Sequence, residues 1–324
     1  MQYRSVFRAG LFEGQSVVVT GGGSGIGRCT AHELAALGAK VALVGRKPEK
    51  LEKVREEIAT AGGAATAHEL AALGAKVALV GRKPEKLDKV RDEIAAAGGS
   101  ATPHVCDIRD EEQVCAMVDA VLATHGRIDG LVNNAGGQFP SPLRDISLKG
   151  WEAVVRTNLT GGFLVARECY RRWMEKHGGA IVNMSADMWG GMPGMAHSGA
   201  ARAGMVNFTE SAACEWAASG VRVNAVAPGW IASSGFETYP PEVQEWAKTL
   251  KTKIPLQRFG TESEAAAAIV FLLSEAASFI TGVTLRIDGG VLNARPTWPL
   301  VPHKRSKAYN GFPLYAPPKF MSEE

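Results

Sequence analysis

A cluster of glycines follows the first apolar segment and is the first feature of the sequence that could do chemistry. Ser16–Thr20 runs into Gly21-Gly22-Gly23-Ser24-Gly25-Ile26-Gly27, after which a helix-period pattern begins. Glycines let the backbone turn tightly and approach a ligand, while the N–H groups at the start of a helix favour an anion. A glycine turn between a first strand and a first helix is typical of dinucleotide sites. The pattern therefore predicts a pyrophosphate site formed by Gly21, Ser24, Gly25, Ile26 and Gly27.

Two basic residues stand where a dinucleotide site distinguishes NAD from NADP. The second apolar segment, Val41–Val44, is followed by Gly45, Arg46 and Lys47. NAD sites place an acidic residue near this point to bind the ribose, whereas Arg accommodates a 2′-phosphate. Arg46 and Lys47 therefore favour NADP(H). The alternative is a basic helix start without a ligand, and a repeat of the segment offers Arg82 as an equal candidate.

Cysteine and histidine spacings indicate neither a metal site nor a disulfide framework. The five cysteines include no Cys-x-x-Cys pair, and the seven histidines show no His-x-x-x-His spacing beside carboxylates. An odd cysteine count fits a reducing compartment. The net charge of +3 is spread over mixed charges, so we expect no nucleic-acid partner. No apolar run reaches membrane-spanning length, and we expect a soluble, cytoplasmic enzyme.

Short Val- and Ile-rich runs alternate with longer amphipathic stretches over residues 1–290. The runs that indicate strands are Ser16–Thr20, Val41–Val44, Thr102–Cys106, Ile128–Val132, Ala180–Met184, Val221–Ala225 and Val283–Ile287. Such alternation predicts an α/β fold, with a Rossmann-type doubly wound parallel sheet in a single domain. A chain of 324 residues, 46% of them apolar, is long enough to bury such a core.

Residues 30–65 recur almost unchanged as residues 66–101. The copies differ only at Glu52/Asp88, Glu56/Asp92, Thr60/Ala96 and Ala64/Ser100, and each copy reads helix, strand, helix. Two copies are too few for a solenoid, so the pattern indicates a tandem duplication within the sheet, or an error in the assembled sequence. The second copy either bulges out, at about 0.6 kcal/mol per doubling of loop length, or adds a strand beside that of the first.

The periodic pattern stops after Asp288, Gly289 and Gly290. Residues 291–324 form a tail rich in Pro, aromatic and basic residues. Such a tail is either disordered or draped over the domain or a neighbouring subunit. Draping is favoured by the aromatic residues Trp298, Tyr309, Phe312 and Tyr315.

Two further motifs, Asn133-Asn134-Ala135-Gly136 and Pro228-Gly229, complete a resemblance to the short-chain dehydrogenase/reductase family. The resemblance covers about residues 11–290, apart from the extra copy. Within the family, the chain resembles peroxisomal trans-2-enoyl-CoA reductases and their bacterial relatives. The strings that carry this likeness are Asn134–Phe139, Lys149–Trp151, Thr157–Gly161, His197–Gly204 and Ala277–Gly282. The Pro-rich tail also resembles bacterial proteins assigned to citronellol and related terpenoid alcohol oxidation.

The resemblance implies a cofactor site shared among several loops. Asp107 would contact the adenine. Asn133 and Ala135 would line the bottom of the cofactor pocket, and Ile231 would contact the carboxamide. The motif residues beside them are Gly136, Pro228 and Gly229. Asp107 can play this role only next to the strand that carries Arg46. An inserted strand would move it by about 4.8 Å, and for this reason we favour the bulge.

The family's usual catalytic set is Asn, Ser, Tyr and Lys, with the last two spaced Tyr-x-x-x-Lys. Asn158 and Ser185 match the first two, but Ser198 stands at the tyrosine position and Arg202 at the lysine position. A phenol has a pKa of about 10, whereas an aliphatic hydroxyl lies near that of water, about 15.7. Ser198 is therefore a poor proton donor. Arg202 can still bind ribose hydroxyls and stabilise an oxyanion.

His197 is the nearest titratable side chain to the missing tyrosine. Histidine is a suitable acid or base near pH 7, so His197 is a candidate proton donor. The alternative is that its ring packs beside a helix start. Tyr239 lies in a stretch that covers substrate in related enzymes and is a second candidate, whereas we expect Tyr170 to pack on a helix.

Three functions are compatible with such a centre. Reduction of the conjugated C=C of an enoyl thioester needs no phenol at the carbonyl oxygen, because the proton goes to carbon. Interconversion of an alcohol and a carbonyl, as for a terpenol and its aldehyde, is harder without the tyrosine. A nucleotide-binding protein without catalysis is the third. The chemistry favours the enoyl reductase and the tail favours the terpenoid enzyme.

The partners expected are a small-molecule substrate and further copies of the same chain. The family resemblance implies a homotetramer whose subunits pair through the helices near residues 151–176 and 200–218. The sequence thus predicts an NADP(H)-dependent oxidoreductase with an altered catalytic centre.

Overall fold

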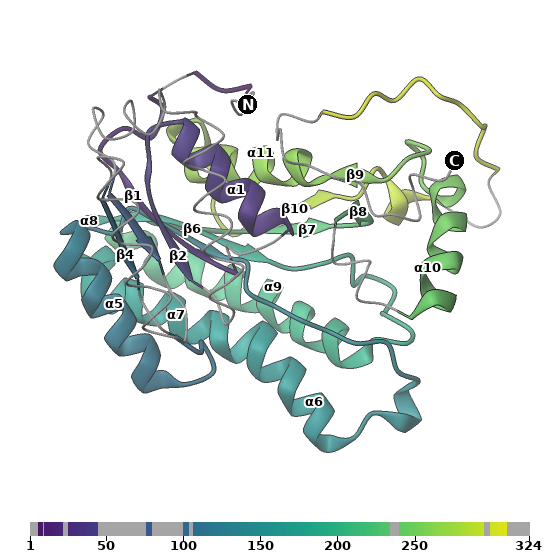
Figure 1. Cartoon of the computed structure of the whole chain (residues 1–324), viewed down its shortest axis with the longest axis horizontal. Coiled ribbons are helices and arrows are strands. Elements are labelled where there is room, and N and C mark those ends of the chain that lie inside the picture. Colours follow the sequence, from purple (N-terminus) through teal and green to yellow (C-terminus); the bar gives the residue numbers. More distant parts are fainter. Residues whose placement is uncertain are drawn as a thin grey trace.

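The computed structural model describes residues 6–8, 10–21, 25–44, 76–79, 100–103, 106–233, 240–294 and 299–309. The main element of this part of the chain is an eight-stranded sheet whose paired strands are all parallel (Figure 1). In sheet order the strands are β10 (Thr284–Ile287), β7 (Val221–Pro228), β6 (Gly179–Met184), β5 (Gly130–Asn133), β1 (Ser16–Thr20), β2 (Lys40–Val44), β3 (Lys76–Leu79) and β4 (Ser100–Pro103). The predicted Rossmann-type α/β fold is confirmed.

Helices cover both faces of the sheet because successive side chains of each strand point to opposite sides (Figure 1). In β1, Val17 and Val19 join one buried cluster, together with Leu34. Val18 joins a second cluster, together with Val165. Helices α1 (Gly25–Ala36) and α11 (Glu262–Leu273) lie on the first face, and α5 (Glu111–His125), α7 (Gly161–Cys169) and α9 (Ala196–Trp216) lie on the second.

Shorter elements complete the described part of the fold. They are the helices α6 (Leu148–Val155), α8 (Glu175–His177) and α10 (Pro241–Lys248), and a small sheet of β8 (Ile231–Ala232) and β9 (Gly260–Thr261). No helix within the described ranges is both long and apolar enough to cross a membrane.

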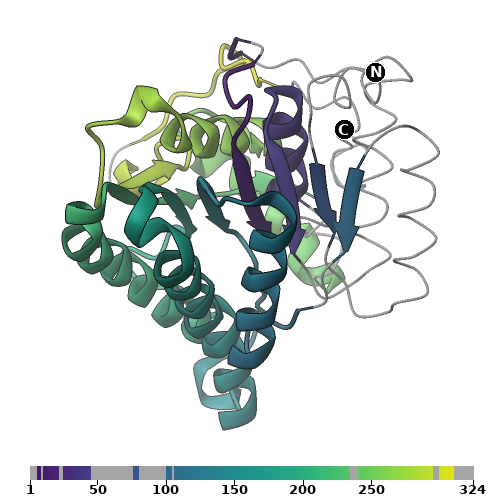
Figure 2. The same ribbon diagram turned by 90° about the vertical axis from the view of Figure 1, so that its left-hand side faces the viewer.

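The repeated segment adds a strand to the sheet, so the prediction that the second copy bulges out was wrong. Strand β3 comes from the second copy and lies between β2 and β4, at the edge drawn in blue in Figure 2. Its register pairs Ala42 with Ala78 and Leu43 with Leu79, which are equivalent positions of the two copies. An apolar strand needs partners for its backbone N–H and C=O groups, and the sheet supplies them on both sides.

The inserted strand β3 separates β4 from β2, but the residues that follow β4 pack in the core of the domain. Cys106 and Ile108 belong to the buried cluster that contains Val18 and Ala42. Asp107 lies between them, where it pairs with Arg109 and its backbone N–H donates to Gln113. The described part of strand β4 covers Ser100–Pro103, and Cys106, predicted as the last residue of this strand, is buried in the core.

The described part of the C-terminal tail lies on the domain. Residues 299–309 run past the segment before α11, where Arg258 donates to the hydroxyl of Ser306 at 2.9 Å. The Thr261 hydroxyl donates to the carbonyl oxygen of Tyr309. The other tail aromatics, Trp298, Phe312 and Tyr315, lie outside the described residues.

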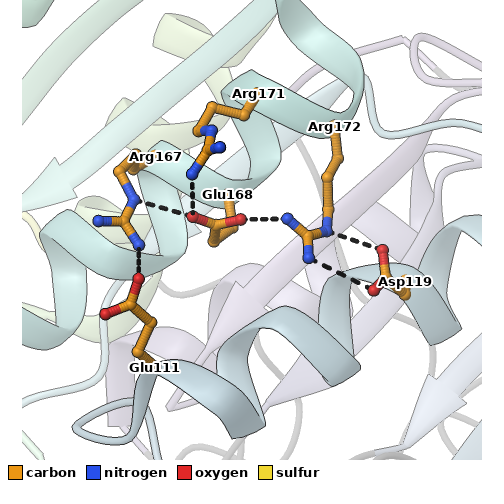
Figure 3. Close-up of polar contacts among 6 residues, drawn as sticks. All are labelled: Glu111, Asp119, Arg167, Glu168, Arg171 and Arg172. Carbon is orange, nitrogen blue, oxygen red and sulfur yellow. Dashed lines mark hydrogen bonds and ion pairs between the residues drawn. The ribbon is translucent and has the colours of Figure 1, made fainter.

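A buried carboxylate joins α7 to α5 (Figure 3). Glu168 is 1% exposed and accepts hydrogen bonds from Arg167 and Arg172, which in turn pair with carboxylates on α5. The full cluster consists of Glu111, Asp119, Arg167, Glu168, Arg171 and Arg172. Hydrogen bonds to charged groups stabilise a fold by about 1.5–3 kcal/mol each, so this cluster fixes how α7 sits beside α5.

Replacing this carboxylate should destabilise the protein. Glu168→Ala removes the shared acceptor and should lower the free energy of unfolding by about 2–3 kcal/mol in urea denaturation. The matched control is Glu111→Ala, whose carboxylate is 58% exposed and should contribute less than about 1 kcal/mol. Equal losses in the two variants would show that burial of Glu168 is unimportant.

Candidate active site

Hydrogen bonds from side chains and backbone groups connect the glycine turn to the end of β5. The Thr20 hydroxyl accepts from the N–H of Ala135 at 2.9 Å and donates to the Val132 carbonyl. The Asn134 amide donates to the carbonyl oxygens of Thr20 and Gly21 at 3.1 and 3.3 Å. The Asn-Asn-Ala-Gly motif therefore holds the turn that precedes α1.

Two glycines of the turn pack too closely for any side chain. Gly21 has a φ of 66°, and a methyl group there would lie 2.8 Å from the Asn134 amide nitrogen. A methyl group at Gly27 would lie 2.7 Å from the Gly21 carbonyl oxygen. At Gly25, where α1 begins, the nearest atom described would be a Glu262 carboxylate oxygen at 3.9 Å.

This arrangement fits the pyrophosphate of a dinucleotide. A helix N-terminus presents N–H groups to an anion, and the glycines let the backbone approach it. Gly21, Gly25, Ile26 and Gly27 would hold the group. Three other predicted contacts, Ser24, Arg46 and Lys47, lie outside the described residues.

Asn158 is held in a π-helical turn, Arg156–Thr160, between α6 and α7. It is 2% exposed, and its amide exchanges two hydrogen bonds with the backbone of Gly137, at 2.8 and 2.9 Å. Single π-turns inside helices often mark functional sites. Here the turn directs Asn158 at the loop that follows β5.

Arg202 and Ser185 meet below the carboxyl end of β6. The Ser185 hydroxyl donates to the Arg202 carbonyl at 3.2 Å, and the Arg202 guanidinium donates to the Met184 carbonyl. A methyl group at Gly136 would lie 2.6 Å from Arg202 Nη2, so the guanidinium also reaches the loop after β5. Burial lowers the pKa of Arg202 to about 10, so the side chain stays cationic at neutral pH.

Ser198 and His197, at the start of α9, are both fully buried. The Ser198 hydroxyl donates to the Gln138 side chain at 2.6 Å, and the Ser198 N–H donates to His197 Nδ1. The His197 ring packs edge-on against Phe139, with centroids 4.5 Å apart. Its Nε2 atom has no hydrogen-bond partner among the described residues.

A cavity of about 460 Å³ opens at the carboxyl ends of β5, β6 and β7. It is lined by Ile26, Gly136, Gly137, Gln138, Ala186, Asp187, Met192, Met195, Pro228, Gly229, Trp230, Ile231 and Ser233. The lining brings together the predicted residues Ile26, Gly136, Pro228, Gly229 and Ile231. None of the predicted catalytic residues is among the lining residues; these are Asn158, Ser185, His197, Ser198 and Arg202.

The sequence predictions missed three polar residues at this site. Asn134 holds the glycine turn, Gln138 accepts from Ser198, and Asp187 lines the cavity. Asp187 carried a usable signal, because it stands two residues after Ser185, just beyond the carboxyl end of a parallel strand, where ligands bind in such folds. Burial raises the pKa of Asp187, and the negative charge of Asp288 raises it further.

The remaining predicted residues lie as follows. The Asn133 amide is used inside the protein, where it donates to Gly162 and Asn183. Tyr170 packs on Trp216 with ring centroids 4.3 Å apart, as expected, and Tyr239 lies outside the described residues. Within the part of the chain that the structure describes, no three His, Cys, Asp or Glu side chains form a group suited to a metal ion.

Family models match most of the chain. Residues 58–292 match the model described as enoyl-(acyl carrier protein) reductase, and residues 15–65 match the model described as short chain dehydrogenase. The two matches meet inside the repeat.

Individual relatives carry several activities in their names. The peroxisomal 2,4-dienoyl-CoA reductase of Danio rerio is 33% identical over 292 residues, which are 89% of this chain and 85% of that protein. The structure of the citronellol catabolism dehydrogenase AtuB of Pseudomonas aeruginosa PAO1 is 55% identical, with a TM-score of 0.67, and the match covers 89% of this chain and 99% of AtuB.

A second similar structure was solved with a cofactor. This Beutenbergia cavernae protein, with NADP bound at low occupancy, is 32% identical with a TM-score of 0.68, and the match covers 88% of this chain and all of that one. The parallel sheet, the glycine turn and these matches agree: the chain belongs to the short-chain dehydrogenase/reductase family of oxidoreductases.

Proposed function

We propose that the protein is an NADP(H)-dependent reductase of a conjugated C=C bond in an enoyl thioester. The observation that carries this proposal is the burial and the hydrogen bonding of Ser198. The residue at the family's tyrosine position is fully buried and its hydroxyl donates to Gln138, so no phenol stands there to protonate a carbonyl oxygen. Asn158, Ser185 and Arg202 keep their buried places around it.

Reduction of a conjugated C=C bond suits such a centre. A dinucleotide held at the glycine turn would supply hydride to the β-carbon of the substrate. Negative charge then develops on the carbonyl oxygen, where the buried cation of Arg202 and the hydroxyl of Ser185 stabilise it. The proton is added at carbon, which removes the need for an acid at the oxygen. The Danio rerio relative is named for reduction of a conjugated dienoyl thioester, which is a reaction of the same broad class.

A second candidate is the oxidation of a terpenoid alcohol. It is favoured by the 55% identity to the citronellol catabolism dehydrogenase AtuB over 89% of this chain. An alcohol must lose its hydroxyl proton as hydride leaves, and that step is slower without a phenol paired with a cation. The chemistry of the site therefore ranks this candidate second.

NADPH consumption with a medium-chain trans-2-enoyl-CoA tests the proposal. Turnover of the purified enzyme would support a C=C reductase, with product formation checked by mass spectrometry. Turnover with citronellol and NADP⁺ alone would favour the alcohol dehydrogenase. Binding of NADPH without turnover of either substrate would indicate a nucleotide-binding protein without catalysis.

Cofactor choice is proposed to depend on Arg46. Strand β2, which leads to Arg46, is the neighbour of β1, whereas β3 of the second copy is one strand further away. Arg46→Ala should therefore raise the KM for NADPH about 10- to 100-fold and leave that for NADH unchanged, since one charge-assisted pair contributes about 1.5–3 kcal/mol. Arg82→Ala is the matched control and should change neither. The reverse pattern would assign the phosphate to the second copy.

We also propose that the protein forms a homotetramer through the helical face that includes α7 and α9. Phe163 is 37% exposed on this face and packs edge-on against Phe208, with Arg167 over its ring. Burial of such an aromatic pair in a subunit contact would stabilise an assembly. Sedimentation velocity measures the state directly.

A further inference from the structure

One carboxylate of the cavity has no role in the steps described so far. Asp187 stands two residues beyond Ser185, and its backbone N–H donates to the Pro228 carbonyl at 3.4 Å. This bond holds the segment after β6 against the end of β7. The side chain lines the cavity together with the loop after β5 and residues 228–231.

The surroundings of Asp187 favour a neutral carboxyl group. Its Oδ1 atom is buried and has no hydrogen-bond partner among the described residues. A buried charged oxygen without a partner is costly, whereas a protonated carboxyl can donate a hydrogen bond. Burial raises the pKa, Asp288 raises it further, and Arg286 opposes them. These two groups, on β10 and in the turn after it, are the charged neighbours that act on it.

The other described residues that line the cavity offer no comparable acid. Their side chains are apolar except for Gln138 and Ser233, neither of which titrates near neutrality. His197 is fully buried against Phe139 and does not line the cavity. Asp187 is thus the titratable side chain among the lining residues that the structure describes.

We propose that Asp187 supplies the proton that completes the reduction. The inference rests on the proposed function. When the β-carbon gains hydride, the C=C electron pair moves onto the carbonyl group as an enolate. The O–H bond of Asp187 breaks, a C–H bond forms at the α-carbon, and the carboxylate then regains a proton from water. The two electrons that the substrate gains would come as hydride from the dinucleotide.

The test compares Asp187→Asn with the wild type on a medium-chain trans-2-enoyl-CoA. The amide has a similar shape but no acidic proton, so kcat should fall about 100-fold with little change in KM. In the wild type, kcat should decrease as the pH rises through the pKa of Asp187, and the variant should lose this dependence. Asp145→Asn changes an exposed carboxylate paired with Arg144 and should behave as the wild type does.

Two measurements separate proton transfer from a merely structural role. In deuterated water, the wild type should place deuterium on one face of the α-carbon, and Asp187→Asn should give a mixture, as read by NMR of the product. In infrared spectra of the protein without ligands, recorded as the pH is raised, the wild type should keep a protonated carboxyl band to a higher pH than Asp187→Asn does.

Failure of the inference is distinguishable from failure of the proposed function. If the wild type turns over while Asp187→Asn keeps its rate, pH profile and stereochemistry, the role of Asp187 is overturned alone. A carboxyl band that is lost at the same pH in both proteins would also overturn it. If the wild type reduces no enoyl thioester, the proposed function fails and this role fails with it.

Discussion

Gly27→Ala is expected to weaken NADPH binding about 100-fold. The added methyl would collide with the Asn134 amide and would lie 2.7 Å from the Gly21 carbonyl oxygen. Because the Asn134 amide donates to that same carbonyl, the turn must move away from α1 to make room. Overpacking of this kind costs up to about 3 kcal/mol, which corresponds to about two orders of magnitude in a dissociation constant.

Fluorescence titration of NADPH measures this effect, with thermal unfolding recorded for the same samples. Gly126→Ala is the matched control, since Gly126 has a φ of 73° at the end of α5 and a methyl there would meet nothing within 4 Å. It should lose about 1 kcal/mol of stability through backbone strain and keep its affinity for NADPH. Unchanged affinity in Gly27→Ala would show that the turn does not contact the cofactor.

The second large effect is expected at Arg202, where Arg202→Met should lower kcat about 1000-fold without unfolding the protein. The substitution removes the buried cation that lies beside Gly136 and donates to the Met184 carbonyl, and loss of one donor to a developing oxyanion typically reduces kcat by about 10²–10³. The Met184 carbonyl also loses a hydrogen bond, worth about 1 kcal/mol. Relief from holding a buried charge offsets this loss, so the melting temperature should change little.

Arg222 supplies the control, because it is also an arginine that donates to backbone carbonyls. Its guanidinium donates to Leu272, Leu273 and Ser274 at the end of α11, and burial lowers its pKa. Arg222→Met should therefore cost about 2 kcal/mol of stability and leave kcat unchanged. If Arg202→Met also lost stability and kept its kcat, Arg202 would be a structural residue like Arg222.

The strands could be predicted from the sequence where local pattern alone decides. Segments β1, β6 and β10 agree with the predicted ranges to within a residue at each end, because Val- and Ile-rich runs stop at glycine or at a change of period. The place of the second copy could not be predicted in this way. Its residues equal those of the first, so no local difference distinguishes a bulge from a strand. Pairing of Ala42 with Ala78 in the sheet decides it.

The residues of the candidate site could likewise be predicted only in part. Asn158, Ser185 and Arg202 follow from motif spacing, and the structure brings them together around the loop after β5. Asp187 belongs to no motif, and Gln138 lies in a motif that gives it no role, so their importance depends on the contacts that form on folding. The Ser198–Gln138 bond, for instance, joins residues 60 positions apart in the chain.

The inserted strand also has a consequence for how the chain folds. The strands of the two copies present the same side chains, so β2 and β3 are equivalent local partners for β1. Only the entropy of loop closure distinguishes the two pairings. The first copy begins its strand about 20 residues after β1, and the second begins its strand about 56 residues after β1. This difference favours the first copy by about 0.9 kcal/mol, a preference of four- to five-fold. About one chain in five or six would therefore pair the second copy with β1 first and would have to break that contact before β3 takes its place beside β2.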